Sequence, residues 1–136
     1  MLKVVYDTNV LVSAVLKSQS FPAFLVSLAL QHRVELCVSP ELLKEYREVL
    51  QRPKFKLPPT TVDIFIEDIQ KHSRMVHPQE RVVADVDAGD RHVLECAVSA
   101  DAEYLVTGNI KHFPSPRFRK ITILPPAAFA LRFLTS

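Results

Sequence analysis

Three acidic residues of this chain, Asp7, Glu45 and Asp90, are the side chains best suited by type and position to bind a divalent cation. They belong to separate segments, so only the folded chain can bring them together. Mg²⁺ and Mn²⁺ prefer carboxylate and water oxygens, and Mg²⁺ is usually held by one or two carboxylates with water and a substrate phosphate. The chemistry that such a cluster serves is phosphodiester hydrolysis, in which the cation activates water and neutralises the leaving oxygen.

Asp7 directly follows residues 2–6, a short apolar run that predicts a buried strand. Thr8 and Asn9 come next and add two oxygen-bearing side chains, which we expect to bind substrate. In open parallel sheets, ligands bind at the carboxyl ends of the strands. The position therefore favours a site residue, and the alternative is that Asp7 only caps the following helix.

A second polar turn has the same relation to a strand predicted at residues 104–107, which Gly108 closes. Thr107 and Asn109 flank this glycine, and Lys111 follows two residues later. We expect Asn109 to assist in metal binding, and Thr107 and Lys111 to contact substrate.

Glu45 lies in a helix that Ser39-Pro40-Glu41 is expected to begin, with an N-cap serine, a proline at the first helical position and an acid in the first turn. The helix is predicted to run to about Gln51. When residues are placed at intervals of about 100°, Glu45 falls at the edge of the apolar stripe, whereas Glu41 and Glu48 fall toward the opposite face. The stripe consists of Leu42, Leu43, Tyr46, Val49 and Leu50. Glu45 is therefore the acid best able to point toward a neighbouring site, although glutamates at such boundaries are common.

Asp90 lies within the apolar stripe of a helix predicted over residues 88–100, at its N-terminal end. The rest of that stripe is Val93, Leu94, Ala97 and Ala100. A buried acid must be paired, capped or metal-bound, because an uncompensated buried charge is very costly. The alternative is that Asp87 caps the helix and Asp90 occupies its first turn, an arrangement that resembles a capping box and suits the helix dipole.

The remaining elements alternate between strands and helices, which predicts βαβ units and a single α/β domain over residues 1–136, with a mainly parallel sheet covered by helices on both faces. The further helices are expected over residues 10–16, 23–32 and 127–134 and from Thr60 or Thr61 onward, and the further strands over residues 34–38, 74–77 and 121–124.

The net charge of +2 excludes a polycation that binds nucleic acid by charge alone. Basic residues nevertheless gather in two proline-containing stretches that are expected to be loops. These groups are Arg52, Lys54 and Lys56, and Arg117, Arg119 and Lys120. Solvated surface is the favoured interpretation, and phosphate contact beside an active site is the alternative.

Other reactive residues give weaker indications. Cys37 and Cys96 each lie in an apolar run without CxxC spacing, which favours buried free thiols. The five histidines form no HxxxH pair, and His92 and His112 are expected to be solvated loop residues, although both could approach the acidic end. With only two glycines, the chain lacks the Gly-rich fingerprints of nucleotide-binding loops.

The N-terminal apolar run is interrupted by Asp7 and Asn9 too early for a secretory signal or a membrane span. We therefore expect a cytoplasmic protein without a membrane association.

At these residues the chain resembles the PIN domain family, and specifically the toxin-type members of prokaryotic toxin-antitoxin loci. Each matching motif is weak alone, but together they occur in the right order along nearly the whole chain. They are Val4-Val5-Tyr6-Asp7-Thr8-Asn9-Val10-Leu11-Val12-Ser13; Ser39-Pro40-Glu41-Leu42-Leu43-Lys44-Glu45-Tyr46; Asp87-Ala88-Gly89-Asp90 with Leu94-Glu95-Cys96-Ala97; and Tyr104-Leu105-Val106-Thr107-Gly108-Asn109 with Phe113-Pro114.

The resemblance implies a three-layer α/β/α fold and Mg²⁺- or Mn²⁺-dependent endoribonuclease activity. Asp7, Glu45 and Asp90 would be the first, second and third catalytic acids. Many relatives carry a fourth acid where this chain has Asn109, which offers a carbonyl oxygen but no charge, so a second metal is expected to bind weakly or only with substrate. The resemblance also implies a homodimer and a small antitoxin that blocks the acidic groove.

The leading hypothesis is therefore an endoribonuclease in which Asp7, Glu45 and Asp90 hold the metal and nearby basic residues contact the RNA backbone. A catalytically silent module that binds RNA or protein is the alternative, and Asn109 is the feature that favours it. A nuclease acting on DNA also stays open, because carboxylates do not distinguish the sugar, whereas contacts to the 2′-hydroxyl do.

Overall fold

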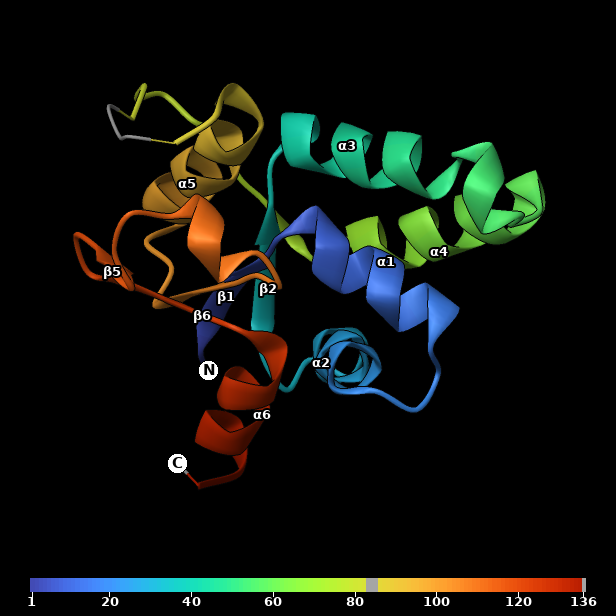
Figure 1. The fold of residues 1–136 in the computed structure, drawn as a ribbon, viewed down its shortest axis with the longest axis horizontal. Helices are drawn as coiled ribbons and strands as arrows, with labels where there is room; N and C mark the ends of the chain where they lie inside the picture. Colours follow the sequence, from blue (N-terminus) through green and yellow to red (C-terminus); the bar gives the residue numbers. More distant parts are fainter. Residues whose placement is uncertain (83–85, 136) are drawn as a thin grey trace.

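The computed structural model of the chain describes residues 1–82 and 86–135, so the last residue of the predicted 1–136 domain and residues 83–85 lie outside the described part. Its elements follow the alternation of strands and helices expected for an α/β fold (Figure 1). They are β1 (Lys3–Tyr6), α1 (Thr8–Leu16), α2 (Phe21–Leu30), β2 (Glu35–Val38), α3 (Pro40–Leu50), η1 (Pro53–Phe55), α4 (Pro59–Lys71), β3 (Arg74–Met75), α5 (Ala88–Ala100), β4 (Tyr104–Val106), η2 (Ile110–His112), β5 (Arg117–Phe118), β6 (Ile121–Leu124) and α6 (Pro126–Thr135).

The strands form one sheet in the order β3-β2-β1-β4-β6-β5. All neighbouring strands are parallel except β5 and β6. Tyr6 pairs with Val106 in the β1–β4 register, so these two central strands end side by side. The prediction of a mainly parallel sheet is confirmed, and the residues that follow β1 and β4 must be close together.

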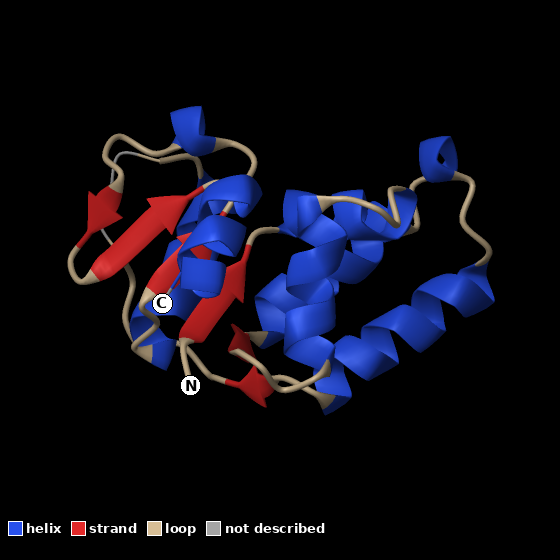
Figure 2. Cartoon of the chain, turned by 90° about the horizontal axis from the view of Figure 1, so that it is seen from below, coloured by secondary structure: helices blue, strands red, loops and turns tan. Residues whose placement is uncertain are grey.

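Helices cover both faces of the sheet, which gives the expected three layers (Figure 2). On one face α5 packs against β1, β2 and β4. On the other face the rings of Tyr6 and Tyr104 pack edge-on against Phe129 of α6, and the Tyr6 hydroxyl donates a hydrogen bond of 2.9 Å to the carbonyl oxygen of Leu25 in α2. The helices α3 and α4 pack against each other and extend beyond the β2 side of the sheet (Figure 1).

The predicted start of α3 is confirmed, because Ser39 Oγ accepts a hydrogen bond of 3.1 Å from the Leu42 amide and Pro40 is the first helical residue. Two other helix starts differ from the prediction. The helix expected over residues 23–32 spans Phe21–Leu30, since Ser20 caps it through the Ala23 amide. The expected Thr60 or Thr61 cap of α4 is wrong: Pro59 is already helical, and no side chain caps the helix.

The second basic group also departs from the prediction. Arg117 and Phe118 form the short strand β5, which pairs antiparallel with β6, where a loop was expected. A strand of two residues is too short to leave an alternating pattern in the sequence, and its pairing with β6 defines it. The other basic group lies on and around η1, a single helical turn in the connection between α3 and α4.

In the described residues, no single helix has the length and apolarity that would be needed to cross a membrane. The pair α1 and α2 reaches that length and composition only when taken together, and the two helices meet at 103°. Both helices supply buried side chains to the core, among them Leu11 and Leu25, which accounts for their apolar composition.

Candidate metal and nucleic-acid site

Asp7 and Thr107 are brought together by the register of the two central strands. Asp7 follows β1 and Thr107 follows β4, and the Thr107 hydroxyl donates a hydrogen bond of 2.8 Å to Asp7 Oδ2. The other carboxylate oxygen, Oδ1, accepts from the Thr8 amide at 2.8 Å, so Asp7 is the N-cap of α1. The capping interpretation of Asp7 is therefore correct, and it leaves Asp7 free to line the cavity described below as well.

Asn9 joins the same two turns through its amide group. Its Nδ2 lies 3.2 Å from Asp7 Oδ2, and its Oδ1 accepts a hydrogen bond of 2.7 Å from the Gly108 amide. A β-carbon at position 108 would lie 3.1 Å from Asn9 Oδ1, which is a tight contact. A glycine at this position therefore allows the two turns to approach each other.

Glu45 is placed by its neighbour Tyr46. The fully buried Tyr46 side chain donates a hydrogen bond of 2.5 Å to the carbonyl oxygen of Tyr6, which fixes α3 at the end of β1. Glu45 Oε2 accepts from the Thr8 hydroxyl, and Glu45 Oε1 accepts from His92 Nε2 at 2.9 Å. The carboxylate is thus held between α1 and α5.

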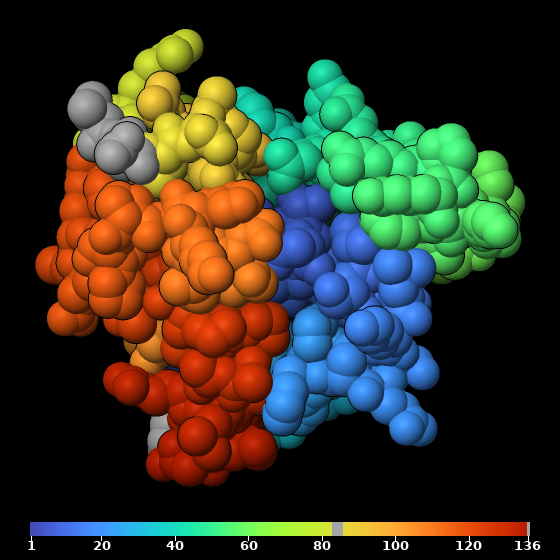
Figure 3. All heavy atoms as spheres, in the orientation of Figure 1, coloured from blue at the N-terminus to red at the C-terminus, as the bar shows by residue number. Residues whose placement is uncertain are grey.

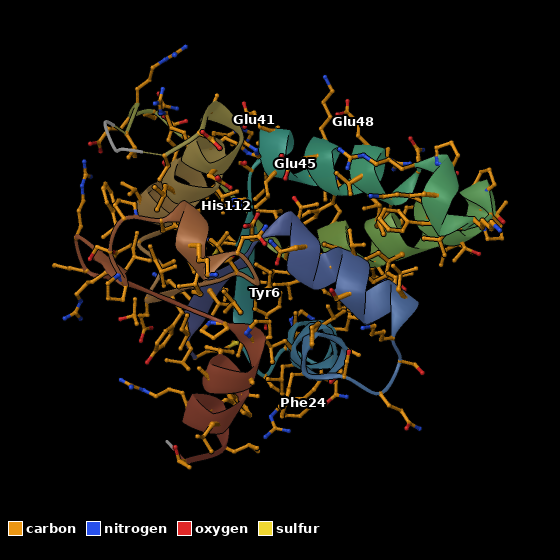
Figure 4. All side chains as sticks on the ribbon, viewed as in Figure 1. Tyr6, Phe24, Glu41, Glu45, Glu48 and His112 are labelled. Atoms are coloured by element: carbon orange, nitrogen blue, oxygen red, sulfur yellow. The ribbon has the colours of Figure 1, made fainter. Side chains whose placement is uncertain are left out.

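The helical-wheel argument for Glu45 is confirmed. Glu45 is partly buried on the side of α3 that faces α1, whereas Glu41 and Glu48 are exposed on the outer side (Figure 4).

Asp90 occupies the first turn of α5, and its side chain is only 15% exposed. The capping-box alternative does not hold in the structure, because the Asp87 side chain makes no capping hydrogen bond. His112 of η2 lies beside Asp90 instead, with 3.3 Å between its Nδ1 and Asp90 Oδ2. The acid is therefore paired with a side chain from a distant segment.

The three acids line a single cavity of about 440 Å³. Thr8, Asn9, Asn109 and His112 add polar groups to its lining, and Val12, Val49 and Phe55 form an apolar wall between α1 and α3. In the space-filling view the N-terminal segment lies at the bottom of a depression between the α3 region and the segment around η2 (Figure 3). Carboxylates from three separate segments thus share one solvent-accessible space.

The acids differ in their electrostatic environment. Burial raises the pKa of Asp7 above its ordinary value of 3.8, and the charges of Asp90 and Glu45 raise it further, although the hydrogen bonds from Thr107 and Thr8 act in the opposite direction. Burial also disfavours ionisation of Glu45, yet the hydrogen bonds from His92 and Thr8 outweigh it and lower the pKa of this carboxyl. A bound cation would relieve the repulsion at Asp7.

Most of the predicted site residues lie together in the structure, with two distinctions. Thr107 is fully buried behind Asp7, so it can orient this carboxylate but is not exposed to a substrate. Lys111 is exposed on η2 and is not part of the cavity lining. Asn109 does line the cavity, as expected.

The two histidines were the main omission of the sequence interpretation. His92 is not a solvated loop residue but a helical residue whose side chain is 21% exposed and bonded to Glu45. The hydrogen bond to Glu45 raises the pKa of His92. His112 is exposed as expected, but it lies at the acidic cavity. Its position three residues after Asn109 is the length of one 3₁₀ turn, which is the only local signal that it shares a side with that residue.

The site is open rather than closed around an ion. Among the described residues, no three His, Cys, Asp or Glu side chains are gathered closely enough to hold a metal by themselves. The donors occur in pairs, such as Asp90 with His112, and a hard divalent cation that keeps several waters needs only one or two carboxylates from the protein. The donor set therefore fits such a cation when water and a phosphate complete its shell.

Comparison with known proteins gives one family and one fold. A sequence model of the PIN domain matches residues 3–111. A similar solved structure is that of VapBC2 from Rickettsia felis bound to a DNA fragment from their promoter, at 15% identity, with a TM-score of 0.64, over 91% of this chain and 98% of that chain. At this identity the likeness shows the fold alone. No curated protein sequence matches the chain significantly.

Proposed function

The chain belongs to the PIN domain family, and from this premise we propose that it is a metal-dependent endoribonuclease that hydrolyses phosphodiester bonds of RNA. The observation that carries the proposal is the convergence of Asp7, Glu45 and Asp90 on one cavity. Two of these acids are too buried to be ordinary surface charges, since Asp7 is 5% exposed and the Asp90 side chain 15%. A cost of this kind is expected where carboxylates serve a cation.

Asp7, Glu45 and Asp90 would hold Mg²⁺ or Mn²⁺, with Asn109 as a neutral oxygen donor. When bound, the cation supplies activation of water and neutralisation of charge on the phosphate. Thr107 and Thr8 orient the carboxylates of Asp7 and Glu45, and their hydroxyl groups are already bonded to these acids. The protein thus provides positioning and negative charge, and no side chain acts as the nucleophile.

A basic turn at one end of the cavity supports a nucleic-acid substrate. Phe55 of η1 lines the cavity, and the ammonium group of Lys54 lies 5.1 Å from the centre of its ring. Arg52 is close enough to Glu45 to help lower the pKa of this carboxyl. Cations beside an acidic cavity can neutralise the phosphates that flank a scissile bond, and an aromatic ring can stack against a base.

We further propose that the protein acts in the cytoplasm as the toxin of a toxin-antitoxin pair. The similar structure of VapBC2 contains a complex bound to promoter DNA, and the same fold in this chain supports a small antitoxin as its partner. An apolar groove of about 680 Å³ that includes Phe21, Phe24 and Leu134 is a candidate surface for a homodimer. Light scattering of the purified chain would measure the oligomeric state.

The test of the nuclease is cleavage of a fluorescently labelled RNA with and without Mn²⁺ or Mg²⁺. We expect metal-dependent cleavage that Asp7→Asn and Asp90→Asn abolish, while Glu48→Gln, an exposed acid on the outer side of α3, leaves it unchanged. A DNA strand of the same sequence shows whether the sugar matters. Equal cleavage by the wild-type protein and the Asp7→Asn variant would assign the activity to a contaminant.

The second candidate is a catalytically silent module that binds RNA or protein. It is favoured by Asn109, which lacks a charge, and by the absence of a closed metal cluster in the described residues. Calorimetry with Mn²⁺ discriminates the two candidates. A nuclease binds the ion and loses affinity on Asp90→Asn replacement, whereas a silent module shows no such dependence.

A further inference from the structure

His112 occupies a position at the acidic cavity that the proposed hydrolysis does not by itself require. It ends η2, and its backbone amide donates a hydrogen bond of 2.9 Å to the carbonyl oxygen of Asn109, which closes the turn. The next residue, Phe113, is buried with 7% exposure and anchors the turn to the core. The imidazole is therefore presented at the cavity by a fixed backbone, although half of the side chain is exposed.

The distance between His112 and Asp90 matches that between two ligands of one ion. Nδ1 of His112 lies 3.3 Å from Asp90 Oδ2. In an octahedral shell with bonds of about 2.1 Å, adjacent ligands lie about 3.0 Å apart. A shift of a few tenths of an ångström would let both atoms bind the same cation, and rotation of an exposed imidazole provides such a shift. A simple surface ion pair is the alternative, and it contributes little to stability.

From this geometry we infer that His112 is a nitrogen ligand of the cation at Asp90 and that it makes the site selective for Mn²⁺ over Mg²⁺. The inference rests on the proposed function, because it assumes that Asp90 holds a cation. Mg²⁺ strongly prefers oxygen ligands, whereas imidazole suits transition metals. One nitrogen among the protein donors therefore favours Mn²⁺ relative to an all-oxygen site. His112 also adds a donor beside Asn109, which brings no charge.

The test is the binding of Mn²⁺ and Mg²⁺ to the full chain without RNA, measured by calorimetry, together with pulsed electron paramagnetic resonance of bound Mn²⁺. In the wild-type protein we expect the resonance spectrum to show a directly coordinated nitrogen. His112→Ala should remove this signal and weaken Mn²⁺ binding by about tenfold or more, with a smaller effect on Mg²⁺. His112→Asp should shift the preference toward Mg²⁺. His77→Ala, which changes an exposed histidine that does not line the cavity, should behave as the wild type.

Each other outcome overturns the inference in a recognisable way. Mn²⁺ binding without a nitrogen signal, or equal affinities for wild type and His112→Ala, would refute the role of His112 and leave the proposed function intact. A nitrogen signal that persists in His112→Ala would assign the ligand to another histidine, His92 being the nearest candidate because it bonds Glu45. Absence of binding of either ion to the folded wild-type chain would refute both the inference and the proposed function.

Discussion

The hydroxyl group of Tyr46 connects the fold of this protein to its candidate site, and its removal should be costly. Tyr46 is fully buried and donates to the carbonyl oxygen of Tyr6 at 2.5 Å. Tyr46→Phe keeps the ring but leaves this carbonyl without its donor. A buried polar group that loses its partner costs about 1–3 kcal/mol. With a urea dependence of about 1–3 kcal/mol per molar, the unfolding midpoint should fall by roughly 1 M.

The chain contains its own controls, since it has only three tyrosines. Tyr6 donates to the carbonyl oxygen of Leu25 at 2.9 Å, so Tyr6→Phe should lose a similar free energy of unfolding. Tyr104 is also buried, but among the described residues its hydroxyl has no hydrogen-bond partner, so Tyr104→Phe should leave the midpoint nearly unchanged. Urea unfolding of the four proteins, followed by circular dichroism, gives the comparison.

Tyr46→Phe should also weaken Mn²⁺ binding, because Glu45 is the next residue and shares the position of α3. Tyr6→Phe provides the matched control for this effect, since its lost bond reaches α2 and not α3. Equal midpoints for Tyr46→Phe and Tyr104→Phe would refute the assigned hydrogen bond. A destabilised Tyr46→Phe protein with unchanged Mn²⁺ affinity would show that this bond supports the fold without positioning Glu45.

Three further predictions follow from burial and charge. Because burial raises the folded-state pKa of Asp7, its ionisation disfavours the folded state as the pH rises above 3.8, so Asp7→Asn should gain stability relative to the wild type between pH 4 and 7; a pH-independent difference in urea midpoint would contradict this. Burial raises the thiol pKa of Cys37 to about 11 and of Cys96 to about 12, so a thiol reagent should label neither in the folded protein and both in denaturant, and rapid labelling of the folded protein would be contrary evidence. Arg52→Gln and Lys54→Gln, made in the cleavage-deficient Asp7→Asn protein, should each weaken binding of single-stranded RNA and lower the salt dependence by about 0.7 per phosphate contact, as measured by fluorescence anisotropy, and an unchanged slope would exclude the basic turn from the RNA path.

The elements were predictable where a short segment carries its own signal. The start of α3 was placed correctly because serine, proline and glutamate act on the amides of the first turn, which are local interactions. The start of α4 was wrong because the threonines that resembled a cap follow Pro59, which is already helical. The strand β5 was missed because two residues leave no alternating pattern, and pairing with β6 creates the strand.

The candidate site was predictable as a set of acids but not as an arrangement. The helical wheel distinguished Glu45 from the exposed Glu41 and Glu48, since the side on which a helix is apolar is written in its own sequence. No local pattern predicted that His92 would bond Glu45, because the two residues are 47 positions apart.

By itself, the sequence determined the alternation of strands and helices, the apolar faces that bury them, and the acids available at their ends. These properties depend on residues within a few positions of one another. Only the tertiary structure decided which side chains meet: Thr107 reaches Asp7 across 100 residues because β1 and β4 pair in one register, and His112 reaches Asp90 because η2 folds back over α5. Strand register and helix packing are set by the whole core, so the partners of each acid appear only when the complete chain is folded.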